Sequence, residues 1–163
     1  MKTLVIAGLA ALALFAATTP SAVHAVEDTD GDGCIGDPGP SRLFVVVEGI
    51  RAPARGQIAV SLYPDDKSRY LTHKGKLITG RIDAAAPVTR VCLWLQAPGW
   101  YAVAAYHDAD GNHKFNRNAI GIPTEGFGLS NNPPTPLALP SLSASRFQAR
   151  AGDNTIHIRL RYP

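Results

Sequence analysis

Apolar residues recur at every second position through most of the chain after residue 40. The last such segment, NTIHIRLRY (154–162), alternates isoleucine and leucine with histidine and arginine, and similar alternation occurs in RLFVVVEGI, GQIAVSLYP and VTRVCLWLQ. KLITGRID and SRFQARA are weaker examples, and proline and glycine interrupt the chain between the segments. Because successive side chains of a strand point to opposite faces, these segments predict half-buried β-strands. With GWYAVAAYHD added, they predict an all-β fold of about seven strands, an antiparallel β-sandwich.

The segment GWYAVAAYHD (99–108) differs from the others because both of its faces are apolar or small. We therefore expect this strand to be covered on both sides. The 37 residues of 108–144 contain no recognisable strand, and so long a connection is rarely plain loop in a compact domain. Its apolar residues, which we expect to be buried, are Phe115, Ile120, Ile122, Phe127, Leu129, Leu137 and Leu139. The prediction is a long ordered loop that folds over the sheet.

The first 25 residues have the pattern of a cleaved signal peptide, with a lysine at position 2 and an apolar run over 4–16. The run is too short for a comfortable membrane span. We expect an acidic Gly/Asp-rich segment at 26–41 and a β-sandwich domain at 42–163 that includes the 108–144 loop. The mature protein is then exported, periplasmic or secreted, with no membrane span. A net charge of +3 without clustered basic and aromatic residues argues against a nucleic-acid partner.

The chain has two cysteines, Cys34 and Cys92. In an exported protein an even pair is most simply a disulfide, which here would close a loop of 58 residues and stabilise the fold by about 4 kcal/mol. Two free thiols are the alternative, although neither cysteine lies in a CxxC motif.

Two runs rich in Asp and Gly have the composition of calcium-binding turns. In the first, DTDGDGCIGD, the side chains of Asp28, Asp30 and Asp32 alternate as in the start of an EF-hand loop, but the twelfth position is Gly39 instead of glutamate. The alternative for this run is a flexible acidic tail.

The second run, DADGNHKFN, follows the strand at 99–108. Its candidate ligands are Asp108, Asp110, Asn112, the Lys114 carbonyl and Asn116, and Glu125 is an additional candidate. The glycine is fourth instead of sixth, so only a looser calcium turn remains. The alternative is a turn in which Asp, Gly and Asn satisfy their own backbone. Calcium is the one cofactor that the sequence suggests.

An enzyme is the competing function class. His107 beside Asp108 suggests a small envelope hydrolase that uses His107 with Asp108 or Glu125. Against it, adjacent residues of a strand point to opposite faces, Ser130 lies in no GxSxG motif, and the histidines have no metal-ligand spacing. We expect His107 to be a buried, hydrogen-bonded histidine at a strand end.

The stretch GWYAVAAYHDADGNHKFNRNAIGIPTEGFGLSNNP resembles an exported bacterial family, domain of unknown function 2141. Its members carry a Gly-x-Tyr-Ala strand, then His-Asp-x-Asn/Asp-Gly-Asn, Phe-Asp, Gly-x-Pro-x-Glu-Gly-Phe-Gly and Ser-Asn-Asn. The likeness runs from about Cys34 to Tyr162. It implies a sandwich of immunoglobulin-like or prealbumin-like kind and no particular activity. Asn116 stands where members usually have Asp, which lowers the charge of a metal site, and Leu129 replaces a common Phe.

The function expected is that of a non-catalytic binding or structural module of the cell envelope. The expected binding surface consists of His107, Glu125, Phe127, Ser130 and Asn131 at the mouth of the loop, since loops on rigid scaffolds commonly carry function. The partner is not identified; an envelope glycan or an envelope protein fits this reading.

Overall fold

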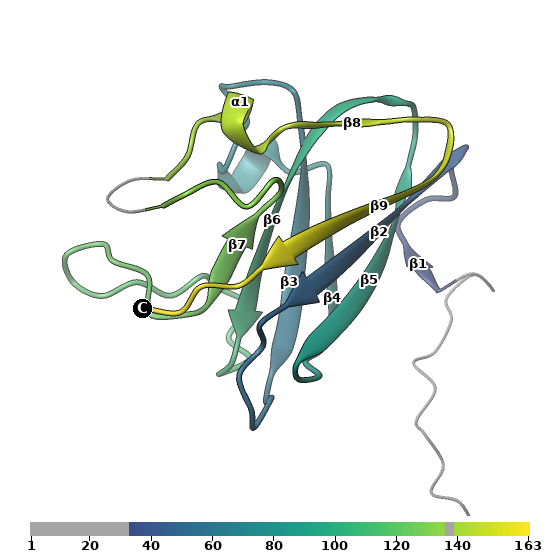
Figure 1. Cartoon of the computed structure of the whole chain (residues 1–163). Helices are drawn as coiled ribbons and strands as arrows, with labels where there is room; N and C mark the ends of the chain where they lie inside the picture. Colours follow the sequence, from purple (N-terminus) through teal and green to yellow (C-terminus); the bar gives the residue numbers. More distant parts are fainter. Residues whose placement is uncertain (1–32, 136–138) are drawn as a thin grey trace, which may run out of the picture.

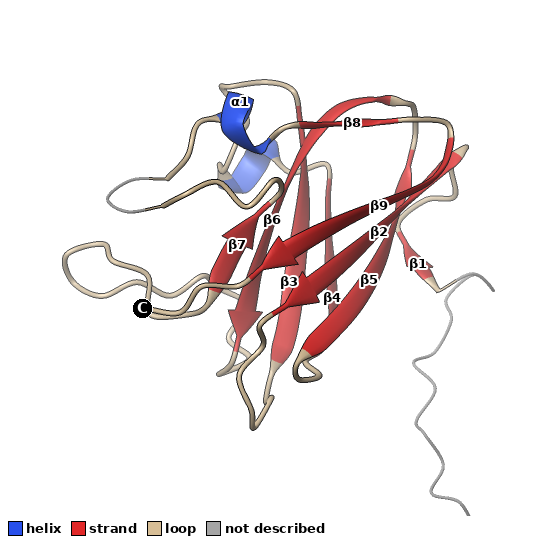
Figure 2. Ribbon diagram, viewed as in Figure 1, coloured by secondary structure: helices blue, strands red, loops and turns tan. Residues whose placement is uncertain are grey.

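The computed structural model describes residues 33–135 and 139–163. These residues form two packed layers of β-strands with one short helix at an edge (Figures 1 and 2). The predicted signal peptide, most of the acidic segment with Asp28, Asp30 and Asp32, and Leu137 lie outside the described residues. The elements are β1 (Cys34–Ile35), β2 (Ser41–Glu48), β3 (Gln57–Pro64), the 3-10 turn η1 (His73–Gly75), β4 (Ile78–Asp83), β5 (Val88–Leu95), β6 (Gly99–Asp108), β7 (Phe127–Leu129), α1 (Leu142–Ser145), β8 (Phe147–Ala149) and β9 (Gly152–Arg159).

The strands form a four-stranded sheet in the order β1-β5-β2-β9 and a five-stranded sheet in the order β4-β3-β6-β7, with β8 also paired to β6. The predicted all-β, sandwich-like class is confirmed. Most pairs are antiparallel, but β2 pairs with β9 in parallel, and so does β1 with β5. The chain leaves β8 in one sheet and crosses to the other sheet as β9, so β9 is not joined to β2 by a hairpin.

The interior between the sheets contains the apolar residues that the alternation predicts. The side chains with less than 2% exposure include Leu43, Val45, Val47, Ile58, Val60, Leu93, Leu95, Val103 and Ile158. Ile156 is only partly buried, although it packs against the same core. This buried apolar layer is the main stabilising contribution to such a fold.

All seven predicted strands are present, with shorter bounds for the two weaker ones, and two strands were not predicted. The first is β1, which has two residues and lies on β5 where Cys34 pairs with Cys92. The second is β7, whose three residues, Phe-Gly-Leu, are too few to show an alternating pattern. The prediction that 108–144 contains no strand is therefore wrong at 127–129.

The two cysteines form the predicted disulfide, with their Cα atoms 4.4 Å apart. It joins β1 to β5 at one edge of the four-stranded sheet. Within residues 33–135 and 139–163, no helix is both long enough and apolar enough to cross a membrane.

The strand β6 is buried on its inner face and covered only in part on its outer face. Val103 and Ala105 face the interior, whereas Ala102 packs on the outer face against Tyr63 and Leu142. Trp100 on the outer face is 45% exposed, so the predicted cover on both sides is confirmed at Ala102 and wrong at Trp100. The segment after residue 139 therefore contributes to the cover, through Leu142 of α1.

Part of the predicted cover stands away from the sheet. Ile120, Ile122 and Leu139 are 79%, 49% and 43% exposed, so their predicted burial is wrong. Residues 116–124 form a small hairpin that closes on itself, with Asn118 N–H donating to the Ile122 carbonyl and Thr124 N–H to the Asn116 carbonyl. Its tip extends beside the C-terminus (Figure 1). Local hydrogen bonding thus replaces contact with the sheet.

Candidate functional site

Asp108 is the last residue of β6, and its carboxylate is fully buried. Its Oδ2 accepts a hydrogen bond from the His113 backbone N–H at 2.9 Å and from Arg81 Nη1 at 3.3 Å. Its Oδ1 is buried and has no hydrogen-bond partner among the described residues. A buried carboxylate oxygen without a partner is costly, so Asp108 Oδ1 is a candidate ligand atom for a cation.

Glu125 brings a second buried carboxylate to the same place. It lies just after the 116–124 hairpin and is 8% exposed. Its Oε2 accepts the Asn116 backbone N–H at 2.9 Å, and its Oε1 is buried without a partner in the described part of the chain. Burial raises the pKa of Glu125 above 4.5, the negative charges of Asp108 and Asp110 raise it further, and the Asn116 N–H opposes the shift.

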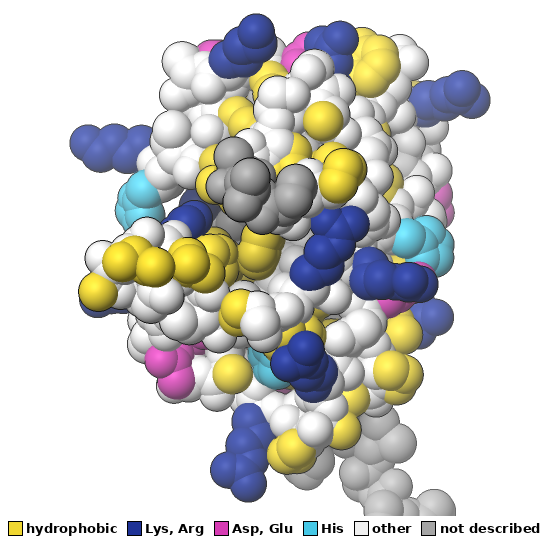
Figure 3. Space-filling view, turned by 60° about the vertical axis from the view of Figure 1, so that its left-hand side comes forward, with side chains coloured by type: hydrophobic (Ala, Val, Ile, Leu, Met, Phe, Trp, Pro, Cys, Tyr) yellow, Lys and Arg dark blue, Asp and Glu magenta, His cyan; other side chains and the backbone are white. Residues whose placement is uncertain are grey.

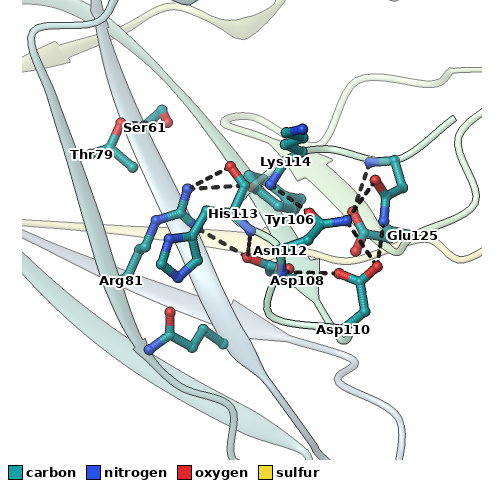
Figure 4. Close-up of polar contacts among 12 residues, drawn as sticks. Ser61, Thr79, Arg81, Tyr106, Asp108, Asp110, Asn112, His113, Lys114 and Glu125 are labelled. Atoms are coloured by element: carbon teal, nitrogen blue, oxygen red, sulfur yellow. Dashed lines mark hydrogen bonds and ion pairs between the residues drawn. The ribbon is translucent and has the colours of Figure 1, made fainter.

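Asp110, which is exposed, completes a group of three carboxylates (Figure 4). One oxygen each from Asp108, Asp110 and Glu125 lies within 4.8 Å of the other two. Three converging carboxylates suit a hard cation such as Ca²⁺, which binds oxygen ligands and leaves its other positions to water or carbonyl groups. Of the predicted metal ligands, the structure thus brings together Asp108, Asp110 and the additional candidate Glu125.

Two of the other predicted ligands, Asn112 and Asn116, use their side chains in hydrogen bonds of the turn. Their amide groups donate to Asp110 Oδ2 at 2.9 and 2.8 Å. Asn112 Oδ1 accepts the Lys114 backbone N–H at 2.7 Å, and Asn116 Oδ1 accepts the Asn112 side-chain amide at 3.0 Å. These contacts agree with the alternative interpretation, a turn whose polar groups form hydrogen bonds with one another. They also fix the position of Asp110.

His107 lies on the opposite face of β6 from Asp108. It is 5% exposed, with Nδ1 2.8 Å from the Tyr162 hydroxyl and Nε2 2.7 Å from the Arg55 carbonyl. The prediction of a buried, hydrogen-bonded histidine is confirmed. Since both ring nitrogens are engaged, His107 is not part of an accessible binding surface.

Two further residues of the predicted binding surface have a structural role. Ser130 is 1% exposed; it accepts the Val103 N–H at 2.9 Å and donates to the Ser145 carbonyl. Asn131 donates to the Arg146 carbonyl at 2.7 Å. These bonds connect the end of β7 with β6 and with the helix α1. Ser130 is therefore corrected from a surface residue to a buried connection.

A groove of about 810 Å³ that the sequence does not predict lies on the outer face of the five-stranded sheet. Thr79, Ser61 and Ala104 form one cross-strand row of its floor, and Arg81 and Tyr106, which flank the buried Ala59, form the next. Its walls are formed by His113, Lys114, Phe115 and Arg117 of the loop and by Leu71, Thr72, His73 and Lys76. We call it the outer groove; Figure 3 shows a hollow on this side, with basic side chains and a histidine near it. The available signal was the polar positions that alternate with apolar ones in β3 and β4.

Arg81 connects the carboxylate group with the outer groove (Figure 4). Besides Asp108, it donates through Nη2 to the Tyr106 hydroxyl at 3.1 Å and to the His113 carbonyl at 3.2 Å. The His113 backbone N–H donates to Asp108. Arg81, His113 and Asp108 thus form one closed set of contacts between the two sites.

The comparisons with known proteins identify the family of the chain and nothing more specific. A family model described as an uncharacterized protein conserved in bacteria matches residues 45–157. No curated protein and no solved structure matches the chain. The geometry of the site therefore has to supply the argument for function.

Proposed function

The chain belongs to the DUF2141 family of uncharacterized bacterial proteins, and from this premise we propose that it is a non-catalytic binding module of the cell envelope. In this proposal a Ca²⁺ ion held by Asp108, Asp110 and Glu125 organises the β6–β7 loop, residues 109–126. The loop then forms one wall of a binding surface on the rigid sandwich.

The observation that carries the calcium proposal is the pair of unpartnered, buried oxygens, Asp108 Oδ1 and Glu125 Oε1. Both belong to carboxylates that lie within 4.8 Å of Asp110. Like charges this close destabilise one another unless a proton or a cation intervenes. A divalent cation satisfies both oxygens at once and offsets most of the repulsion.

The geometry favours this function over a hydrolase that uses His107. The imidazole faces Arg55 and Tyr162, on the other side of β6 from Asp108 and Glu125. A general base must reach the group from which it takes a proton, and His107 shares no cleft with the two acids.

Calorimetric titration of the EDTA-treated full chain with CaCl₂ tests the calcium site. We expect binding by the wild type and at least a tenfold loss of affinity, about 1.4 kcal/mol, in Glu125→Gln. Asp66→Asn is the matched control, because Asp66 is an exposed carboxylate outside the group and outside both Asp-rich runs, and its loss should leave affinity unchanged.

Thermal melts give a second measurement on the same samples. At a calcium concentration one hundred times the dissociation constant, the ion should stabilise the fold by about 2.7 kcal/mol. If the wild type shows no heat of binding and no change in stability, the calcium site is contradicted. The turn that satisfies its own backbone is then the correct interpretation.

Residence in the envelope rests on the N-terminal segment and on the disulfide between Cys34 and Cys92, which favours an oxidising compartment. Fractionation of producing cells should place the processed chain outside the cytoplasm. Recovery of the unprocessed chain in the cytoplasm, with reduced cysteines, would contradict this part of the proposal.

A further inference from the structure

We propose that the outer groove binds an acidic saccharide, a sugar ring that carries a carboxylate. This inference rests on the proposed binding function and specifies the chemistry of its ligand. It comes from the charges, the unused hydrogen-bond donors and the aromatic rings that the groove brings together.

The charges in the outer groove have one sign. Lys76, Arg81, Lys114 and Arg117 line it, and none of its described lining residues is an aspartate or a glutamate. Arg81 is partly offset by Asp108, at 3.3 Å behind the groove. Electrostatic complementarity therefore favours an anion.

Lys76 is the clearest sign of an anionic partner. Its side chain is partly buried in the groove, yet it has no ion pair or hydrogen bond within residues 33–135 and 139–163. Burial lowers the pKa of Lys76, and the nearby positive charge of Arg81 lowers it further. A carboxylate beside Lys76 would offset both effects.

The floor of the groove offers hydroxyl donors that find no acceptor in the described protein. Ser61 and Thr79 share one hydrogen bond at 3.0 Å, so one of the two hydroxyl protons remains for a ligand. The Tyr106 oxygen accepts from Arg81, and its own proton is likewise unused in the described residues. An oxygen-rich ligand can accept from these groups, whereas an alkyl or aryl acid would cover them without partners.

Aromatic rings form the apolar part of the wall nearest the loop. Phe115 packs against Tyr106 and Phe127, with ring centroids 5.4 and 5.5 Å apart. All three line the groove, whose volume lies in the range of small-molecule sites. The C–H face of a sugar ring can pack on such rings while its hydroxyls meet the polar floor.

The test is a ¹H–¹⁵N chemical-shift titration of the calcium-loaded full chain with glucuronate, and with glucose as the uncharged counterpart. We expect shifts confined to groove amides, such as those of Thr79, Arg81 and Lys114, and binding of glucose at least about tenfold weaker than glucuronate. Inorganic phosphate and phenylacetate are titrated in the same way. Equal or tighter binding of any of these three probes, or no binding of glucuronate, would overturn the saccharide assignment.

Lys76→Gln and Lys74→Gln form a matched pair of variants. Lys76 lines the groove, whereas Lys74 is exposed on η1 outside it. Neither side chain is fully buried, so both variants should fold. We expect Lys76→Gln to weaken glucuronate binding about tenfold and Lys74→Gln to leave it unchanged, because only Lys76 can form a charge-assisted bond to the ligand. Equal effects of the two variants would contradict a specific site.

Calcium affinity is measured on the same samples, which separates the two proposals. Intact calcium binding without glucuronate shifts overturns this inference and leaves the calcium-organised loop standing. Glucuronate shifts in a protein that binds no calcium overturn the loop proposal and leave the groove assignment standing.

Discussion

At the scale of single residues, the group of three carboxylates formed by Asp108, Asp110 and Glu125 lowers the stability of the folded chain. Asp108 and Glu125 are both buried, and each keeps one oxygen without a hydrogen bond in the described structure. Burying such groups is unfavourable unless a partner compensates them. Burial raises the pKa of Glu125, and the negative charges of Asp108 and Asp110 raise it further, so this position disfavours the charged form of Glu125.

This shift predicts how the stability of the metal-free protein depends on pH. A raised pKa means that Glu125 stabilises the fold below its unfolded pKa, and this contribution is lost as the pH rises through the folded value. We expect the unfolding free energy of the wild type to fall relative to Glu125→Gln as the pH rises above the unfolded pKa of Glu125, about 4.3. Chemical denaturation in EDTA at several pH values measures the difference.

Glu48 provides a control of opposite sign. Its hydrogen bond from His157 lowers its pKa, so Glu48 contributes stability above its unfolded pKa that is lost as the pH falls. The stability of the wild type relative to Glu48→Gln should therefore increase as the pH rises through the acidic range in which Glu48 loses its proton. A flat difference between wild type and Glu125→Gln would show that Glu125 is not perturbed.

At the scale of elements, β6 separates two chemical environments by its alternation alone. Tyr106 and Asp108 lie on the face of the groove and the carboxylates, whereas His107 lies on the face of Arg55 and Tyr162. His107 and Asp108 are thus adjacent in the sequence, but their side chains face different surroundings and cannot contact the same ligand.

The short strand β7 depends on close packing at its central glycine. A Cβ added to Gly128 would lie 2.6 Å from Ile158 Cγ2 and 2.7 Å from the Arg159 carbonyl oxygen. We expect Gly128→Ala to destabilise the fold by about 1–3 kcal/mol, because β7 must move away from β9. Urea denaturation measures the change. Gly99→Ala is the control, with its nearest contact at 3.7 Å, and equal effects in both would contradict the packing argument.

The sequence was sufficient for the elements whose pattern is long and regular. The eight-residue strands and the buried inner face of β6 follow from alternation, and the disulfide follows from the count of cysteines. The strand β7 could not be predicted, because its three residues carry no period and its pairing depends on distant parts of the chain.

The candidate site was predictable only in part. The Asp-rich turn drew attention to Asp108 and Asp110, and Glu125 was a plausible addition. The amide contacts of Asn112 and the burial of Ser130 depend on how the loop folds back, which spacing does not encode. The outer groove does not follow from residue spacing, because residues from β3, β4, β6, β7 and several loops form it together.

At the scale of the whole molecule, the disulfide lies at the β1 edge of the four-stranded sheet, whereas Asp108 ends β6 in the five-stranded sheet. Closing a loop of 58 residues should stabilise the fold by about 4 kcal/mol. We expect the double variant Cys34→Ala/Cys92→Ala to lose about this much in urea denaturation and to keep its calcium affinity while folded. A parallel loss of calcium affinity in the folded variant would contradict the independence of the two regions.

The carboxylate group and the outer groove, by contrast, share Arg81. This guanidinium contacts Asp108 on one side and the Tyr106 hydroxyl and His113 carbonyl on the other. When Ca²⁺ neutralises the carboxylates, the positive charge of Arg81 is less compensated, so the groove should attract an anion more strongly.

Calcium and glucuronate should therefore bind cooperatively, and thermodynamic linkage requires each to raise the affinity for the other by the same factor. We expect a factor of about five or more, measured by titrating glucuronate with and without calcium, and calcium with and without glucuronate. Arg81→Lys keeps the charge but loses the forked contacts, so the factor should fall toward one in this variant. Two sites that both bind, yet with affinities independent of each other, would show that Arg81 does not transmit the charge of the ion to the groove.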